Sequence, residues 1–312
     1  MPVSALPLTG GQYDIAAGEY QATVTELGAG LRSLSLSGEH LTRTYDADEL
    51  PPAGAGQLLA PWPNRIDHGK YSFGGRSYQL DLSEPAHNNA IHGLTRFATW
   101  SVIGRQADQV ELGIQLLGRP GYPFCLDLSA RYRLSAETGL EVTVTACNAG
   151  SRPAPFGTGS HPYLVAGTGS VDSWQLQLPA ARWQPADERG IPAGRTEDVA
   201  GSQYDFRERR SIGATSLDTA FTGLYTGEDG RAQVRLTGPD AEIELWAGPG
   251  YRWLQVFTGD TLGPDTRRRA LAVEPMTCPP NAFVTGIDLL TIEPGGNVTR
   301  QWGIQATKKK IS

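Results

Sequence analysis

The stretch 126-LDLSARYRLSAETGLEVTVTAC-147 alternates apolar and polar residues on both sides of a short turn-forming segment. One alternating run covers Leu126–Leu134 and a second covers Leu140–Cys147. Because successive side chains of a β-strand point to opposite faces, each run places its apolar residues on one face. Ser135–Gly139 supplies the turn residues between the runs. The stretch therefore predicts an antiparallel hairpin with one buried face.

Other parts of the chain have the same strand character, and stretches that favour helix are scarce. Gly (38) and Pro (22) make up about a fifth of the 312 residues, and they cost a helix interior roughly 1 and 3 kcal/mol relative to Ala. Short strands separated by Gly and Pro turns are typical of stacked antiparallel sheets. The sequence predicts an all-β protein, a large antiparallel β-sandwich with little helix. The other expected strands are Tyr20–Leu27, Leu31–Leu36, Tyr71–Leu82 around the Gly74-Gly75 turn, Val110–Leu117, Trp174–Leu178, Gln233–Leu236, Glu242–Trp246, Trp253–Thr258, Ala270–Glu274 and Leu289–Glu293.

The segment Pro179–Leu217 has the weakest strand pattern, because Pro, Gly, Arg and Glu are mixed there without a period. We interpret it as a long surface loop. Loops of this length often border functional sites.

The charge balance excludes some classes of partner. Lys and Arg number 27 against 33 Asp and Glu, a net charge of −6, whereas a nucleic-acid surface needs clustered Lys and Arg. The basic clusters Arg267–Arg269 and Lys308–Lys310 are interpreted as a solvated turn and a frayed tail. No apolar run reaches 18 residues, and residues 1–14 lack the pattern of a signal peptide. We expect a cytoplasmic protein with no nucleic-acid or membrane partner.

The cysteines and histidines lack the spacing of a metal site. Cys125, Cys147 and Cys278 are far apart, odd in number and without a C-x-x-C motif, which argues against a disulfide framework and a structural zinc. His87 and His92 are five residues apart with no third ligand nearby. We expect three free thiols and no metal ion.

Two residues are the best acid–base candidates. His161, in PFGTGSHPYL, follows small residues that let a ligand approach and precedes a proline, and imidazole exchanges protons near neutral pH. Glu274, in ALAVEPMTC, ends an apolar run, so we expect its carboxylate to be partly buried, with a raised pKa. The alternatives are a structural histidine at a strand end and a carboxylate that reaches solvent.

Further residues carry groups that suit a polyhydroxylated ligand. Trp62, Asn64 and Arg65, in LAPWPNRIDHG, supply an aromatic face, an amide and a planar guanidinium with five donors. Asp218, in SLDTAF, could accept hydrogen bonds or form an Asx turn. Gln255 is a polar residue inside the aromatic run RWLQVFTG. The motifs G-x-x-x-x-G-K-[ST] and G-x-S-x-G, which mark phosphate-binding loops and serine nucleophiles, are absent.

Taken in order along the chain, these motifs resemble those of the aldose 1-epimerase (galactose mutarotase) family. Any one motif is unspecific, but seven in the right order over most of the chain are not expected by chance. They are Asn64-Arg65-Ile66 followed by Gly69–Gly75 (G-x-Y-x-F-x-G), Ile91-His92-Gly93, Gly121-Tyr122-Pro123 leading to the strand with Tyr132, Ser160-His161-Pro162-Tyr163, Leu217-Asp218, Gln255 before Thr258, and Val273-Glu274-Pro275.

The resemblance implies one β-sandwich domain over residues 1–312, with a concave face that binds sugar. It implies a cofactor-free interconversion of the α and β anomers of a free hexose. Glu274 would then be the general base for the anomeric hydroxyl, and His161 the general acid for the ring oxygen. The residues implied to hold the sugar are Arg65, His92, Asp218, Gln255, Asn64 and Tyr163. The expected partner is a monosaccharide, and we expect a monomer or a weak homodimer.

This chemistry requires an ionised Glu274 beside a protonated His161. If the two side chains are partly buried together, each charge favours the other. We therefore expect a bell-shaped dependence of activity on pH.

The sequence departs from the commoner family pattern at two places. In the first loop Pro63 precedes Asn64, and Trp62 stands where a small residue is frequent. After His161 the sequence reads Pro162-Tyr163-Leu164, without the usual Phe-Asn. These differences leave the identity of the sugar open. Trp62 could stack on a sugar face or narrow the pocket, and its role is left open.

Three other functions stay open at this stage. The first is a mutarotase for phosphorylated hexoses, whose phosphate would be held by Arg96, Arg182 or the cluster Arg267–Arg269. The second is a non-catalytic carbohydrate-binding protein on the same fold. The third is a glycoside hydrolase that uses Asp218 as the second carboxylate beside Glu274.

Overall fold

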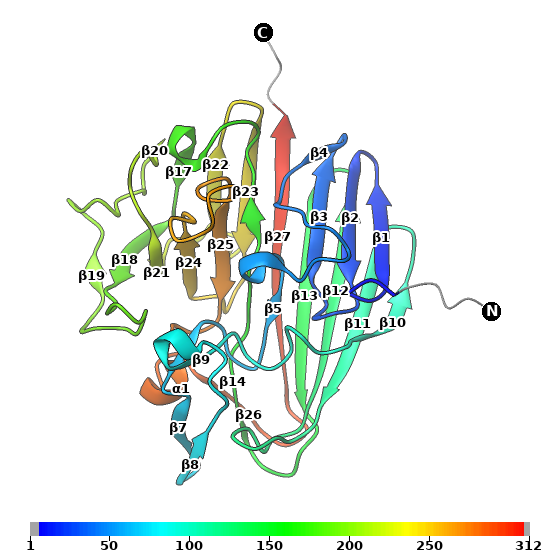
Figure 1. Cartoon of the computed structure of the whole chain (residues 1–312), viewed down its shortest axis with the longest axis vertical. Helices are drawn as coiled ribbons and strands as arrows, with labels where there is room; N and C mark the ends of the chain where they lie inside the picture. The colour runs from blue at the N-terminus through cyan, green and yellow to red at the C-terminus, as the bar shows by residue number, and fades with distance from the viewer. Residues whose placement is uncertain (1–5, 309–312) are drawn as a thin grey trace.

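The computed structural model describes residues 6–308, and antiparallel strands dominate it (Figure 1). The hairpin expected from residues 126–147 is present as β12 (Leu126–Ser135) and β13 (Gly139–Asn148). The two strands pair from Leu126 opposite Asn148 to Ser135 opposite Gly139. Along most of each strand, buried apolar residues alternate with polar residues that are half-buried or exposed. The predicted hairpin with one buried face is therefore confirmed.

The hairpin belongs to the largest sheet, called here the large sheet. Its β27, an element the sequence analysis missed, runs through the middle between β13 and β23. The strand order is β10 (Ser101–Arg105), β11 (Gln109–Leu116), β12, β13, β27 (Asn297–Lys308), β23 (Ala241–Ala247), β22 (Ala232–Thr237), β17 (Gln175–Gln177) and β20 (Arg210–Ser211).

A small sheet near the amino terminus covers one side of the large sheet. Its first two strands contact β12, and Figure 1 shows it in blue in front of the green strands. The strand order is β1 (Gln12–Ala17), β2 (Tyr20–Thr25), β3 (Leu31–Leu36) and β4 (Glu39–His40).

A third sheet, the site sheet, carries most of the predicted chemistry. Its strand order is β19 (Glu197–Asp198), β18 (Ala180–Gln184), β21 (Asp218–Leu224), β24 (Trp253–Phe257), β25 (Leu271–Met276), β15 (Gly159–Ser160) and β5 (Leu58–Leu59), and β16 (Tyr163–Leu164) also pairs with β25. Beside these sheets lie the strand pairs β6 (Arg65–Asp67) with β9 (Asn89–Ile91), β7 (Lys70–Phe73) with β8 (Arg76–Gln79), and β14 (Ala154–Phe156) with β26 (Leu290–Ile292).

Helix is scarce, as the Gly and Pro content predicts. Within residues 6–308 the one α-helix is α1 (Ala282–Thr285), and the 3-10 turns are η1 (Pro52–Gly54), η2 (Pro85–His87) and η3 (Val171–Ser173). None of the helices in this described range has the length and apolar character that crossing a lipid bilayer requires.

One hydrophobic cluster joins the three sheets. It includes Val24 of the small sheet, Trp302 of the large sheet and Val273 of the site sheet, each at most 2% exposed. Trp62 also belongs to this cluster, where its ring meets Phe283 edge-on with centroids 5.6 Å apart. The expectation that Trp62 stacks on a sugar is therefore wrong, because its aromatic face is used in the core.

Two expectations about irregular segments need correction. Residues 179–217 do not form a plain loop, since β18, β19 and β20 lie within them and extend two sheets. Arg268 is not solvated: it is buried, and its guanidinium binds Asp172 and Asp260. Of the expected lysine tail, Lys309 and Lys310 lie outside the described residues, as do residues 1–5.

Candidate active site

A cleft of about 460 Å³ opens beside the site sheet. The segments that line it come from distant parts of the chain: β6, the residue after β9, the connection between β15 and β16, β21 and β25. Of the eight residues predicted from the sequence, seven line this cleft, and they are Glu274, His161, Arg65, His92, Asp218, Asn64 and Tyr163. The eighth, Gln255, does not line it.

Glu274 lies inside β25 and not at its end. It stands opposite Gln255 of β24, and β15 and β16 pair with the other edge of β25. The residue is only 2% exposed, so the alternative of a carboxylate that reaches solvent is wrong. Its Oε1 is 3.3 Å from Nε2 of His161. The two acid–base candidates are thus in direct contact.

The imidazole of His161 is held on several sides. The backbone N–H of His161 donates to the carbonyl of Gln57 at 3.0 Å. The ring stacks on Tyr163, with centroids 4.9 Å apart and planes 15° apart, and meets the ring of His92 edge-on at 5.4 Å. A methyl group at Gly54 would lie 3.2 Å from Cδ2 of His161. These contacts fix the direction in which Nε2 points.

Burial favours the uncharged form of both partners. It raises the pKa of Glu274 well above its ordinary value of 4.5, and the charge of Asp218 raises it further. Burial also lowers the pKa of His161 to about 3, with help from the charges of Arg96 and Arg65. The expectation that mutual attraction holds Glu274 ionised and His161 protonated is therefore not met. Desolvation is the largest cause of both shifts.

Asn64 and His92, which also line the cleft, are joined by two hydrogen bonds. The backbone N–H of Asn64 donates to Nδ1 of His92 at 3.2 Å, and the N–H of His92 donates to the carbonyl of Asn64 at 2.9 Å. Both residues have left-handed backbones, with φ of 54° and 61°. Because Nδ1 accepts a hydrogen bond, the proton of the neutral ring is on Nε2. Burial lowers the pKa of His92 well below 6.5, so this ring is a neutral donor.

Arg65 is gripped by Glu84, a residue that sequence reasoning missed. Arg65 Nε donates to Glu84 Oε2 at 2.9 Å, and Nη2 donates to Oε1 at 3.0 Å. Asn89 donates a further hydrogen bond to Glu84 Oε2 at 2.9 Å. Although burial opposes it, the hydrogen bonds from Arg65 and Asn89 lower the pKa of Glu84. Its one sequence signal is an acidic residue directly before Pro85, which is too common to be informative.

Gln255 acts on the cleft through Asp218. Its Nε2 donates to Asp218 Oδ1 at 2.6 Å, and the other carboxylate oxygen of Asp218 is 4.0 Å from Arg65 Nη1. Gln255 is 3% exposed and does not line the cleft. Its amide is bonded to the Asp218 carboxylate, and a direct contact of Gln255 with the ligand stays a prediction.

Arg96 and Phe97 lie on the rim of the cleft. Arg96 was one of the cations considered for a phosphate, and it forms no ion pair among residues 6–308. Its guanidinium lies over the ring of Phe97 at 4.9 Å, and Phe97 is 53% exposed. Arg182, another of those cations, bonds instead to Asp198 and Thr196 of its own segment.

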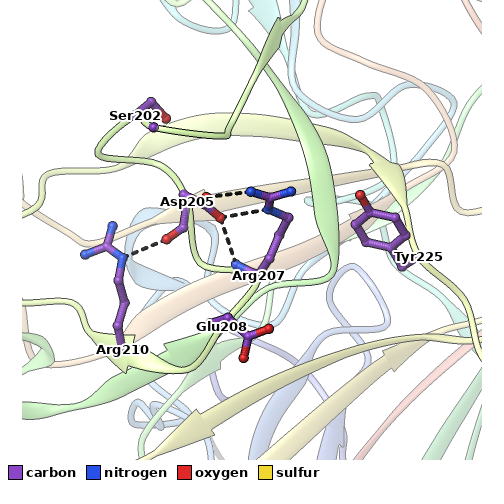
Figure 2. Close-up of a pocket in the computed structure, with 7 residues that line it drawn as sticks. Ser202, Asp205, Arg207, Glu208, Arg210 and Tyr225 are labelled. Atoms are coloured by element: carbon purple, nitrogen blue, oxygen red, sulfur yellow. Dashed lines mark hydrogen bonds and ion pairs between the residues drawn. The ribbon is translucent and has the colours of Figure 1, made fainter.

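A second hollow, of about 860 Å³, lies on residues 201–210 and against Tyr225 (Figure 2). None of the predicted site residues lines it. Asp205 accepts hydrogen bonds from Arg207 at 2.7 and 2.9 Å, and the carbonyl of Asp205 accepts one from Arg210, as Figure 2 shows. These charges are only half-buried and pair with each other, whereas the cleft contains a buried acid–base pair. The cleft is therefore the candidate active site.

Residues 6–308 include no group of three or more His, Cys, Asp or Glu side chains arranged to hold a metal ion. Cys125, Cys147 and Cys278 are all free thiols.

Comparison with known proteins agrees with the fold and with the residues of the cleft. Residues 11–304 match the Aldose 1-epimerase family. The chain belongs to this family, whose members are sugar epimerases and mutarotases.

The chain is similar to three further proteins. It is 38% identical to the uncharacterized protein YihR of Escherichia coli K12 over 95% of this chain and 93% of YihR. It is 26% identical to the aldose 1-epimerase of the same organism, over 67% of this chain and 64% of that enzyme. The structure of a GalM/aldose epimerase homologue from C. elegans has the same fold, with a TM-score of 0.86 and 18% identity over 96% of this chain and 99% of that one.

Proposed function

We propose that this protein is an aldose 1-epimerase that interconverts the α and β anomers of a free hexose. The observation that carries the proposal is the buried contact between Glu274 and His161, 3.3 Å apart in a cleft lined by polar groups. Anomerisation needs one group that removes a proton from O1 and another that delivers a proton to the ring oxygen O5. A carboxylate and an imidazole side by side supply both without a cofactor.

The reaction can be written with the protons balanced. Glu274 takes the proton of the O1 hydroxyl, the C1–O5 bond breaks, and His161 gives its proton to O5, which leaves an open-chain aldehyde. Rotation about C1–C2 turns the other face of the carbonyl toward O5. On closure O5 attacks C1 and returns its proton to His161, while O1 takes back the proton held by Glu274.

The low pKa of His161 and the raised pKa of Glu274 fit this scheme, because the pair holds the same single proton in two arrangements. With the proton on Glu274 both groups are neutral, and with the proton on His161 they are the ion pair that the reaction uses. Burial favours the neutral arrangement. Sugar hydroxyls that donate to the carboxylate favour the ion pair. We propose that substrate binding moves this proton.

The other residues of the cleft are proposed to hold ring hydroxyls. Arg65 offers Nη1 beside Asp218, and His92 offers its Nε2 proton. Asn64 and Tyr163 support these groups: the Asn64 backbone fixes His92, and Tyr163 stacks on His161. Fixed donors and acceptors of this kind orient a ligand at little cost when it binds.

The decisive experiment is polarimetry or NMR of freshly dissolved α-anomers across a panel that includes glucose and galactose. Acceleration above the buffer rate supports the proposal, and the panel ranks the sugars. Sugar binding without acceleration would instead indicate a non-catalytic carbohydrate-binding protein.

One observation favours a second candidate, an epimerase for hexose 6-phosphates. Arg96 lines the same cleft and forms no ion pair within the described residues, so its guanidinium is free to meet an anionic group of the substrate. Glucose 6-phosphate should be added to the panel together with the variant Arg96→Ala. A strict requirement for the phosphate, lost in Arg96→Ala, would favour this candidate over the first.

A further inference from the structure

A tight turn from the segment 179–217 packs against the back of the candidate active site. This turn, residues 187–191, is called here the Arg189 turn. Its ends are joined by one backbone hydrogen bond, from the N–H of Asp187 to the carbonyl of Ile191 at 2.9 Å. The Asp187 carboxylate accepts from the N–H groups of Arg189 and Ile191, both at 2.9 Å. The turn therefore has a defined shape of its own.

Arg189 fastens this turn to the two strands beside the cleft. Its Nη2 donates to Asp67 Oδ1 at 2.5 Å and to Asn89 Oδ1 at 3.1 Å, and its Nε donates to the carbonyl of His87 at 3.0 Å. Asn89 in turn donates to the carbonyl of Arg189 at 3.0 Å. Asp67 and Asn89 stand opposite each other in β6 and β9. Through Asp67, Arg189 is thus hydrogen-bonded to β6, the strand that begins with Arg65.

Gly190 lies directly against the guanidinium of Arg65. A methyl group at Gly190 would stand 2.8 Å from Cζ and 3.0 Å from Nε of Arg65, and it would overlap Nη1. Glu84 accepts hydrogen bonds from Nε and Nη2. Glu84 does not hold Nη1. This nitrogen lies closest to Gly190, and it is 4.0 Å from Asp218 Oδ2.

We propose that the Arg189 turn positions the guanidinium of Arg65 for substrate binding, and that Gly190 is the residue of the turn against which this guanidinium packs. The proposal rests on the proposed function only for the role of Arg65. Glu84 holds the guanidinium through Nε and Nη2, and Nη1 on the far side has no hydrogen bond to Glu84. The turn closes that side, and only glycine combines its left-handed backbone, φ +74°, with the missing side chain.

The same segment offers a matched control for the test. Gly194 has φ +75°, and no atom lies within 4 Å of a methyl group placed there. Gly190→Ala and Gly194→Ala therefore impose the same backbone strain, and they differ in the contact with Arg65. We expect KM to rise at least about tenfold in Gly190→Ala, with kcat within about twofold of wild type. Gly194→Ala should stay within about twofold of wild type in both constants.

A double-mutant cycle separates positioning from a general loss of structure. In an Arg65→Ala background the methyl group at Gly190 meets no guanidinium, so Gly190→Ala should cause less than about a twofold further change. A full additional tenfold loss in that background would overturn the proposal. So would equal kinetics for Gly190→Ala and Gly194→Ala.

The remaining outcomes are also decisive. If Gly190→Ala gives no folded protein, Arg189→Gln serves as the second variant. It removes the hydrogen bonds of Arg189 to Asp67, Asn89 and His87 without adding an atom near Arg65. It should raise KM, and an unchanged KM would overturn the proposal.

If wild type does not accelerate mutarotation at all, the proposed function fails, but the contact between Gly190 and Arg65 can still be tested. Coupling between Gly190→Ala and Arg65→Ala in the unfolding midpoint measures it without any substrate, and additive effects would refute it.

Discussion

Replacing Glu274 with glutamine should sharply lower kcat and stabilise the protein above pH 4.5. The amide has nearly the shape of the carboxyl group but cannot take a proton from O1. Loss of a general base typically lowers kcat by about 10² to 10⁴. His161 is not left as an unpaired buried charge, because its pKa of about 3 keeps it neutral at pH 7. The usual penalty for breaking a buried ion pair is therefore absent.

The gain in stability follows from the raised pKa of Glu274. Above its ordinary value of 4.5 the unfolded chain releases the proton that the folded protein keeps. The wild type then loses about 1.4 kcal/mol of unfolding free energy for each pH unit, until the pH passes the folded-state pKa. The glutamine variant has no such loss. The difference between variant and wild type should be smallest at pH 4 and grow toward pH 8.

Urea unfolding of both proteins at pH 4, 6 and 8 measures this difference, and polarimetry at pH 7 measures the activity. A constant difference across the pH range, or one that favours the wild type more as pH rises, would refute the assignment of Glu274 as a buried acid with a raised pKa. Retained mutarotation would refute its role as the base.

Three further results are expected. His161→Gln should lower kcat by about 10² to 10⁴. The wild type loses stability as pH falls from 6.5 toward 3, because only the unfolded chain then protonates its imidazole. The variant should not show this loss, and melting curves at pH 4 and pH 7 measure it. Gln255→Leu removes the donor to Asp218 and should raise KM more than it lowers kcat, and an unchanged KM would show that Asp218 needs no orientation. Trp62→Ala should destabilise the fold by about 3–5 kcal/mol in urea unfolding, because the ring is buried.

Strand patterns predicted the fold well wherever one face of a strand is apolar throughout. β27 was missed although Val298, Trp302, Ile304 and Ala306 recur at even spacing, because Arg300 interrupts them. Arg300 is tolerated since that part of the strand is only partly buried. β18 was missed because its residues are mixed, and it gains its structure by pairing with β21.

The site residues were identified from local motifs, and their contacts were not. Glu274 and His161 could be named because each has an unusual local setting. Glu84 and Gly190 could not, since an acid before proline and a glycine in a loop are common features. Their importance comes from Arg65, which is distant in sequence and reaches both through the fold. The protonation of the central pair was also unpredictable, because it depends on how deeply the two side chains are buried together.

The hydrogen bond between Arg189 and Asp67 spans 122 residues of sequence, and it has a consequence for how the protein forms. Closing so long a loop costs chain entropy that a single polar contact does not recover, whereas the β12–β13 hairpin closes over a few residues. The hairpin can therefore form early, and the Arg189 turn reaches β6 and β9 only when these two strands are already in place. During refolding, sheet content should return before the protein becomes competent to bind its substrate.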